Sequence, residues 1–449
     1  MNVKDKVDFQ GSLLVRNFRK DYPVAVRGEG VWIWDAARKR YLDFSGSSAV
    51  NLIGHGDREI AEAVAGQIAK LEFVHSSQFV TDVSLEFANE VLQFAGPGFE
   101  GGAVFFTSGG SEAVDSALKL ARQYQVEIGQ IQRNRLLSRR QSYHGATFGA
   151  MTVSGNRKRR EMYLPMLRAY EQVNTPYCYR CQYGGDDCAA KYAAEVEREL
   201  ERTGKDTAAF IFEPVSGATL GAVAPPDGYL KRVTDACRAH GVLTIADEVM
   251  TGFCRTGANF ACAHWNTVSD IIVAGKGVSS GYAPLGAVIA SRKVVDAIRN
   301  GSGNLVHGFT YNAHPPSLAA GRSVLARLQH DEFAANAKEA AHALGKSLRQ
   351  LAARPSVGDV RGIGLLWGVE FVVDKASRRP YAPGKQFAAK VAAAAARLDV
   401  MTYPMQGCVD GITGDHLLIA PPAVIKREEI EFAVEQIGRA VEETTNSCR

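Results

Sequence analysis

The chain has 449 residues, 46% of them hydrophobic, and its 52 Lys and Arg against 48 Asp and Glu leave a formal net charge of +4. This length favours two or three domains, and so small an excess of charge argues against a nucleic-acid or acidic-surface partner. The first residues, MNVKDKVDFQ, carry charges where a signal peptide needs an apolar core, and no apolar run is long enough to span a bilayer. We therefore expect a soluble, cytoplasmic protein.

The N-terminal region predicts a hairpin followed by a helix. The segment GVWIWDAARKRYLDFSG alternates apolar and polar residues around a polar turn at residues 35–40, as a hairpin does. In DREIAEAVAGQIAKL the apolar residues recur at helical spacing, which predicts a helix with one apolar face. That face is formed by Ile60, Val64, Ile68 and Leu71.

From about residue 85 to 330 the pattern strand, turn, helix repeats, with strands too uniformly apolar to have one solvated face. Beyond it come helices, the segment VRGIGLLWGVEFV, which reads as a strand pair or one bent strand, and LLIAPPAVI before a final amphipathic helix. These patterns predict an α/β fold with a large domain at 76–330, whose mostly parallel sheet is flanked by helices. A smaller α+β domain is expected from both termini, at 1–75 and 331–449.

Polar residues follow four of the predicted strands directly. AVFFT leads into SGGSEAV at a helix start, AFIF into Glu213, VLTIA into Asp247 and Glu248, and IIV into Lys276. Each has an ordinary reading on its own, as a helix entry, a cap, a salt-bridge partner or a solvated lysine. Because open parallel sheets bind ligands beyond the carboxyl ends of their strands, we expect the four to converge on one site.

The four strand ends make chemical sense together. Free amides at a helix start hold a phosphate, and a desolvated lysine forms an imine with an aldehyde. A buried carboxylate keeps a proton on a ring nitrogen. This combination predicts pyridoxal 5'-phosphate as the cofactor.

These segments resemble the class III (ω-type) aminotransferases, which are fold type I pyridoxal-phosphate enzymes. The resemblance runs through FFTSGGSEAVDSALKLAR, SYHGATFGAMTVSG, FIFEPVSG, ADEVMTGFCRTG, DIIVAGKGVSSGYAPLGAV, HGFTYNAHP and GDHLLIAPPAVI. It implies a catalytic Lys276, which holds the cofactor as an internal aldimine and shuttles a proton, and an Asp247 that meets the ring nitrogen.

The same resemblance implies the remaining cofactor contacts. Gly110 and Ser111 would bind the phosphate, Tyr143 and Val249 would cover the two ring faces, and His144 would orient the tyrosine. Glu213 would lie near the ring and the substrate entrance. Thr310 would reach the phosphate of a neighbouring subunit, which implies a homodimer, or a tetramer built from it, with its sites at the interface.

The implied reaction is a ping-pong transfer of an amino group from an amine or ω-amino acid to a keto acid such as pyruvate or 2-oxoglutarate. A racemase, aminomutase or lyase of the same fold is the alternative, because Lys276 and Asp247 serve the cofactor in all of them. A non-enzymatic descendant has no need to keep the lysine, the aspartate and the phosphate turn together.

The chain departs from the family pattern at three positions. Relatives that bind an α-carboxylate have an arginine in GDxxRxxPP, where this chain has Leu418, and leucine cannot form a charged fork with a carboxylate. Another arginine then takes this role, with Arg157, Arg159 and Arg160 as candidates, or the acid group is recognised differently. Met250 replaces a polar residue, and Cys254 stands in the place of a glycine in a turn.

Three of the eight cysteines lie close together in CYRCQYGGDDC, at Cys178, Cys181 and Cys188. Eight cysteines are too few for a disulfide framework in a chain of this length, so we expect them to be reduced. The cluster lacks the fourth ligand of a zinc site, and we expect no bound metal. Loop packing or a weak redox role is the expected explanation.

Overall fold

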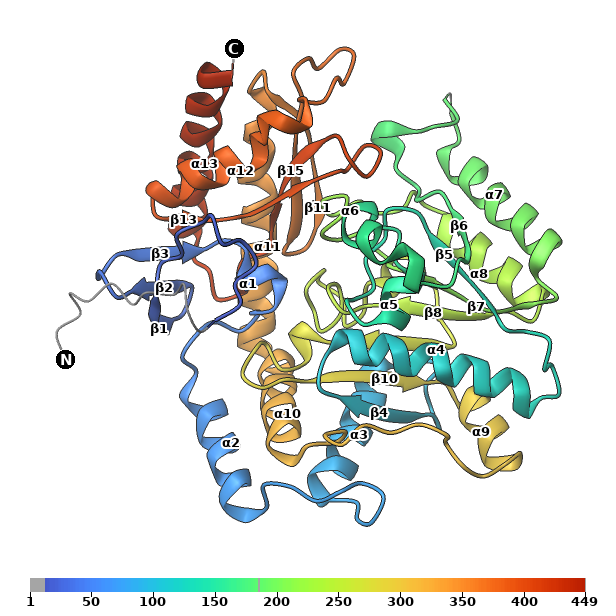
Figure 1. The fold of residues 1–449 in the computed structure, drawn as a ribbon. Helices are drawn as coiled ribbons and strands as arrows, with labels where there is room; N and C mark the ends of the chain where they lie inside the picture. Colours follow the sequence, from blue (N-terminus) through green and yellow to red (C-terminus); the bar gives the residue numbers. More distant parts are fainter. Residues whose placement is uncertain (1–12, 185, 449) are drawn as a thin grey trace.

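A computed structural model describes residues 13–184 and 186–448 of the chain (Figure 1). The strands of these residues form one seven-stranded and two four-stranded sheets. The large sheet takes its strands from the middle of the chain, and the small sheets take theirs from the N-terminal and C-terminal parts. The predicted α/β class, with helices over a mostly parallel sheet, is confirmed.

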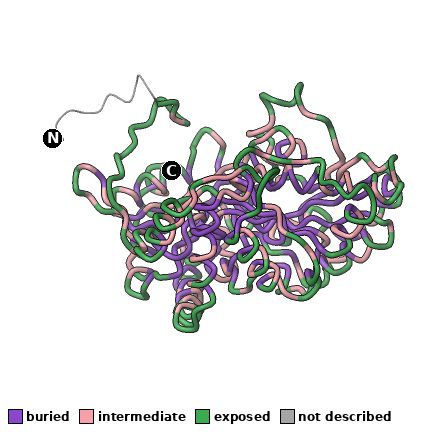
Figure 2. The backbone as a smooth tube through the Cα atoms, turned by 90° about the horizontal axis from the view of Figure 1, so that it is seen from below, coloured by how far each residue is buried: buried purple, intermediate pink, exposed green. Residues whose placement is uncertain are grey.

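The seven-stranded sheet has the order β4-β10-β9-β8-β7-β5-β6. Its strands are β4 (Ala103–Thr107), β5 (Arg135–Arg139), β6 (Glu171–Val173), β7 (Thr207–Phe212), β8 (Leu243–Asp247), β9 (Ile271–Ala274) and β10 (Gly286–Ala290). Only β10 runs antiparallel to its neighbours. The central strands β7, β8 and β9 are buried along their whole length, which explains why they read as continuous apolar runs. Figure 2 shows the buried parts of the chain gathered in the interior, with exposed segments around them.

Helices cover both faces of this sheet. They are α3 (Asp82–Ala95), α4 (Gly110–Glu127), α5 (Phe148–Val153), α6 (Arg157–Arg160), α7 (Cys188–Thr203), α8 (Tyr229–Ala239), α9 (Arg292–Asn300) and α10 (Pro315–Gln329). The alanines of α4 pack with Ile211 and Val273 in one core cluster, while Val233 of α8 and Phe212 belong to another. Alternate residues of a strand thus face opposite helical layers.

The N-terminal sheet has the order β1-β2-β3-β13, formed by β1 (Ala25–Glu29), β2 (Trp32–Asp35), β3 (Arg40–Asp43) and β13 (Val400–Met401). The predicted hairpin is confirmed as β2 and β3, which pair antiparallel. After the short α1 (Gly46–Ala49) comes the predicted helix, α2 (Arg58–Lys70). Of its apolar face, Ile60 is buried but Ile68 is 52% exposed, so only the start of α2 is packed into the core of this chain.

The C-terminal sheet has the order β11-β12-β15-β14, formed by β11 (Val357–Ile363), β12 (Leu366–Phe371), β14 (Tyr403–Gln406) and β15 (Asp415–Ile419). The segment that read as a strand pair or a bent strand is an antiparallel pair, β11 and β12. The helices beside it are α11 (Asp331–Arg349), α12 (Phe387–Arg397) and α13 (Arg427–Cys448). The expected boundaries at 75 and 330 fall between α2 and α3 and between α10 and α11, and the division into domains stays a prediction.

Two buried polar groups tie the C-terminal part to the large sheet. Arg255 donates to the carbonyl oxygens of Asn51, Ala420 and Pro421 at 2.7, 3.2 and 2.6 Å. Glu370 of β12 is fully buried and forms ion pairs with Arg180 and Arg361. It also accepts a hydrogen bond from Tyr177.

The expectation that the cysteines are all reduced is wrong for one pair. Cys178 and Cys188 form a disulfide with their Cα atoms 6.0 Å apart, while Cys181 between them stays free. The fold brings the two thiols together, which their spacing in the sequence does not reveal. Among the described residues, no group of three or more His, Cys, Asp or Glu is arranged to hold a metal ion.

Candidate functional site

Three of the predicted residues leave the sheet at one edge. Strands β7, β8 and β9 are parallel neighbours, and they end at Phe212, Asp247 and Ala274. Glu213, Asp247 and Lys276 therefore emerge side by side, where parallel strands place their ligands. Glu213 and Asp247 are buried, and Lys276 is partly buried.

Lys276 has an unusual backbone conformation, and burial alters the pKa of its amine. Its φ of 45° lies in the left-handed region, which a long side chain rarely adopts, and such residues cluster at functional sites. Burial lowers the pKa of the Lys276 amine to about 8, although the charges of Asp247 and Glu213 raise it. The charges of Arg255 and Arg159 lower this pKa further. An amine with such a pKa is partly neutral near pH 8 and able to act as a nucleophile or base.

The carboxylate of Asp247 contacts a histidine side chain and a backbone amide of the turn that follows it. Nδ1 of His144 lies 2.6 Å from Oδ2 of Asp247, and the amide of Val249 donates to Oδ1 at 3.1 Å. His144 thus contacts Asp247 directly, whereas the sequence indicated only a role in orienting Tyr143. Nε2 of His144 is buried without a partner among the described residues.

Glu213 lies between two backbone amides of neighbouring loops. It accepts from the amide of Tyr143 at 3.2 Å and from the amide of Gly217 at 3.1 Å. Burial raises the pKa of Glu213, the charge on His144 lowers it, and Asp247 raises it. The first of these bonds links Glu213 to Tyr143, and the sequence analysis assigned both residues to one site.

The start of α4 forms the fourth part of the site. The backbone amides of Gly109, Gly110 and Ser111 have no acceptor among the described residues, and the helix behind them is 18 residues long. A Cβ on Gly110 would lie 2.8 Å from Cγ1 of Val249, and a Cβ on Gly275 would lie 3.2 Å from the same atom. Gly110 and Val249 therefore pack beside the residue that precedes Lys276. Ser111 faces the 143–146 loop, because its Oγ accepts from the amide of Ala146 at 3.1 Å.

Thr310 stands apart from this group. It is exposed, and no hydrogen bond or ion pair joins it to the other candidate residues within the described ranges. The nearby His307 donates to or accepts from Ser116 of α4 at 2.8 Å, which places this segment along the outer side of that helix. The role of Thr310 toward another subunit stays a prediction.

Comparison with known proteins identifies the family. The model of the family "Aminotransferase class-III" matches residues 16–441. An uncharacterized aminotransferase YodT of Bacillus subtilis (strain 168) is 37% identical over 424 residues, which cover 94% of this chain and 95% of that protein. This chain belongs to the class III aminotransferases. It is an enzyme, and its place in the family confirms the resemblance that the sequence indicated.

Two solved structures show how closely this class III aminotransferase follows its relatives. An (S)-enantioselective omega-transaminase from Thermomicrobium roseum is 36% identical, with a TM-score of 0.88 over 95% of this chain and 93% of that chain. A PMP-bound form of an aminotransferase from Vibrio fluvialis is 25% identical, with a TM-score of 0.90 over 98% of each chain. Within the part of the chain that is described, no helix of the aminotransferase is long and apolar enough to cross a membrane.

Two of the three departures from the family pattern, Leu418 and Met250, lie in one apolar wall of this aminotransferase. Leu418 lies in β15, is fully buried, and belongs to a core cluster with Val215 and Ala49. Met250 packs against this cluster, and its sulfur would lie 2.4 Å from a Cβ on Gly217, beside Glu213. The wall therefore offers no charge at the place where the resemblance to the family implied an arginine. Sequence reasoning treated Leu418 and Met250 as separate changes, and nothing in their spacing shows that they meet.

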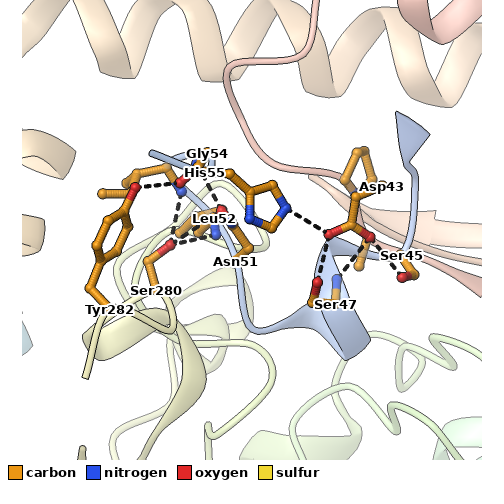
Figure 3. Close-up of polar contacts among 12 residues, drawn as sticks. Asp43, Ser45, Ser47, Asn51, Leu52, Gly54, His55, Ser280 and Tyr282 are labelled. Carbon is orange, nitrogen blue, oxygen red and sulfur yellow. Dashed lines mark hydrogen bonds and ion pairs between the residues drawn. The ribbon is translucent and has the colours of Figure 1, made fainter. Parts of the chain in front are cut away.

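The sequence did not single out the turn that brings Ala49 to this wall. Gly46, Ser47, Ser48 and Ala49 all have positive φ, between 49° and 69°. Asp43 holds the turn by accepting from the amide of Ser47 at 2.9 Å (Figure 3). Its carboxylate also accepts from the hydroxyls of Ser45 and Ser47 and lies 3.1 Å from Nε2 of His55.

The same segment is fastened to the chain beyond Lys276 (Figure 3). Oγ of Ser280 accepts from the amide of Leu52 at 2.7 Å, and the hydroxyl of Tyr282 donates to the carbonyl of Gly54 at 2.8 Å. Consecutive left-handed residues leave no signature in composition or periodicity, so only the three-dimensional structure identifies this turn.

Cys254, the third departure, also has a positive φ, of 68°. The turn therefore accepts a side chain in a conformation that favours glycine. Its thiol lies 3.8 Å from Oδ1 of Asn259, away from the strand ends. No role in the site follows from it.

Proposed function

We propose that this class III aminotransferase uses pyridoxal 5'-phosphate to move an amino group from an amine or ω-amino acid to a keto acid. The observation that carries the proposal is the pairing of a lysine of lowered pKa with a buried carboxylate at neighbouring strand ends. The free amides at the start of α4 fit a phosphate, since a long helix directs partial positive charge toward its first amides. The residues present thus fit the cofactor.

Each residue would have a defined task. Gly110 and Ser111 would bind the phosphate, Asp247 would keep the ring nitrogen protonated, and Lys276 would hold the aldehyde through its amine. Tyr143 and Val249 would lie on the two ring faces, with Glu213 near the substrate entrance. When bound, pyridoxal phosphate supplies an aldehyde that accepts amines and a ring that delocalises the electron pair left by a broken Cα–H bond.

The chain's own contribution to proton transfer rests on Lys276 and His144. With a pKa of about 8, Nζ of Lys276 takes up and returns a proton near neutral pH at little cost in free energy. His144 donates from Nδ1 to Asp247 and so fixes the orientation of that carboxylate.

The enzyme is proposed to act as a homodimer, alone or within a tetramer, with Thr310 reaching the site of the other subunit. The exposure of Thr310 in the isolated chain leaves it accessible to a second copy. The wider segment is apolar and exposed as well, with Val306 80% and Tyr311 60% accessible.

Spectroscopy with a donor amine and no acceptor tests the reaction. An aminotransferase converts its bound cofactor to the amine form in one half-reaction, so the aldehyde absorption should disappear without turnover. A racemase, aminomutase or lyase returns the cofactor unchanged, and an unaltered band with every amine tried would reject transfer. Borohydride should tag Lys276, and Lys276→Ala should abolish turnover while the protein stays folded. Tagging at another residue would reject the assignment of Lys276.

A further inference from the structure

The three arginines of α6 face three different directions. Arg157 is exposed and lies beside Gly411, where a Cβ would be 3.2 Å from its Cβ. Arg160 is half-buried and donates to the carbonyl of Thr152 at 3.4 Å. Arg159 places its guanidinium carbon 4.5 Å from the ring centroid of Tyr143. Only Arg159 therefore turns toward the candidate site.

Arg159 is held in place from two sides. Its Nη2 donates to the hydroxyl of Tyr403 at 3.4 Å, and the ring of Tyr143 covers the guanidinium plane. Tyr143 is in turn fixed by the bond from its amide to Glu213. Stacking of this kind orients a guanidinium and leaves its edge free to bind an anion.

No carboxylate of the described residues neutralises Arg159. Asp247 is engaged by His144, and Glu213 accepts from two backbone amides. Arg159 nevertheless lies close enough to Lys276 for its charge to lower the pKa of that amine. Two cations thus share a partly buried region in which an anionic group would find an unpaired guanidinium.

The C-terminal sheet beside Arg159 does not supply this recognition. Leu418 is the cross-strand neighbour of Tyr403 and lies with Met250 in the apolar wall. Arg255, whose charge also lowers the pKa of Lys276, uses its donors on three carbonyl groups. Arg159 is therefore the cation near Lys276 with donors left for a substrate. Its planar fork matches the two oxygens of a carboxylate.

We propose that Arg159 binds the carboxylate of the amino acceptor, an inference that rests on the proposed function. The site would thereby select carbonyl compounds that carry a carboxylate. The apolar part of the substrate lies against Met250, which is partly buried beside Glu213. The carboxylate lies at the free edge of the guanidinium, between Tyr143 and Tyr403 of β14. Recognition thus comes from α6 and not from β15, where the resemblance to the family implied an arginine.

Kinetics with a charged and a neutral acceptor test this assignment. With one uncharged donor amine, Arg159→Gln should raise the KM for pyruvate roughly 10- to 100-fold, the loss expected for a charge-assisted hydrogen bond. Propanal, which lacks the carboxylate, should react as with the unaltered enzyme, within about twofold by the same reasoning. Arg159→Lys should fall between the two, and Arg157→Gln, the matched loss of charge two residues away, should change neither acceptor.

Calorimetry gives a second readout that needs no turnover. Propanoate should bind the cofactor-loaded enzyme roughly 10- to 100-fold more weakly after Arg159→Gln, while 1-propanol should bind both alike. Unchanged affinity for propanoate, or an equal loss for pyruvate and propanal, would overturn the role of Arg159. An enzyme that binds propanoate through Arg159 but transfers no amino group to any acceptor would instead reject the proposed function alone.

Discussion

Among the single residues, Lys276 lies at a position that lowers the stability of the folded chain but makes its amine more reactive. Burial disfavours its charged form, and its backbone lies in the left-handed region. The folded chain thus stores strain at the residue that is proposed to hold the cofactor.

The lowered pKa of Lys276 has a defined effect on stability. The unfolded lysine, with a pKa of 10.5, binds more protons than the folded one, with a pKa of about 8. The free energy of unfolding therefore rises with pH between these two values, and the whole penalty is present below about pH 8. Its size is up to about 3 kcal/mol, because each pKa unit corresponds to about 1.4 kcal/mol.

We predict that Lys276→Met stabilises the cofactor-free protein at pH 7 by roughly 1 to 3 kcal/mol, since it removes a buried charge and keeps the volume of the side chain. Chemical denaturation of the cofactor-free protein at pH 7 measures this difference. Lys346→Met, at an exposed position of α11, is the control and should change stability by less than about 0.5 kcal/mol. A Lys276→Met protein no more stable than the control would contradict the burial of the amine.

At the scale of elements, the junction of β4 and α4 depends on the absence of a side chain. Gly110 lies so close to Val249 that the first turn of α4 and the end of β8 are in contact. This contact sets the position of the free amides relative to Asp247. The geometry of the proposed phosphate site thus depends on the packing of α4 against the end of β8, and not on Gly110 alone.

Gly110→Ala should weaken binding of pyridoxal phosphate about tenfold or more, because its Cβ would lie 2.8 Å from Cγ1 of Val249 and displace the helix start. Fluorescence titration of the cofactor-free protein with pyridoxal phosphate measures the affinity. Gly66→Ala in α2, where a Cβ meets no atom within 4 Å, is the matched control and should bind as before. Equal affinity in all three proteins would show that α4 does not need this close approach.

The sequence predicts those features of the elements that depend on residues close together in the chain. The apolar runs of β7, β8 and β9 and the residues that follow them lie within a few positions, so both the strands and the convergence of Asp247 and Lys276 were predictable. The bond from His144 to Asp247 and the stacking of Arg159 on Tyr143 join separate segments. No periodicity encodes such contacts, and the sequence therefore left the choice among three arginines open.

The disulfide and the left-handed turn were missed for related reasons. Cys178 and Cys188 meet because the loop between them folds back, and the thiol count gave no hint of it. The turn at Gly46–Ala49 depends on the carboxylate of Asp43, to which the sequence analysis assigned no role. Both features rest on tertiary contacts that override local preference.

At the scale of the whole molecule, Glu370 joins two parts that are far apart in the sequence. Its carboxylate contacts Tyr177 and Arg180 from the loop before α7 and Arg361 from β11. Burial alone would raise the pKa of Glu370, but Arg361 and Arg180 lower it. The stabilisation is therefore present above the unfolded pKa of 4.5 and is lost as the pH falls below it.

Glu370→Gln should lower the free energy of unfolding at pH 7 by roughly 3 kcal/mol, because it leaves two arginines beside an uncharged amide in a buried position. The difference from the unaltered protein should shrink on acidification below about pH 4.5. Thermal unfolding followed between pH 4 and pH 7 measures both effects. Glu443→Gln, in an exposed pair with Arg397, is the control and should cost less than about 1 kcal/mol. A pH profile of Glu370→Gln parallel to that of the unaltered protein would count against this junction.

The turn at Gly46–Ala49 also constrains how the protein is made. Phe44 accepts a hydrogen bond from the amide of Ala420 at 3.0 Å, and Leu52 accepts one from Ala423 at 2.6 Å. During synthesis, this segment is made long before Ala420 and Ala423, to which it is hydrogen-bonded in the folded chain. Pairings of such sequence separation form late and leave the early segment exposed in the meantime. A ribosome-bound chain lacking its last strand would therefore carry the proposed lysine and aspartate but no closed wall around them.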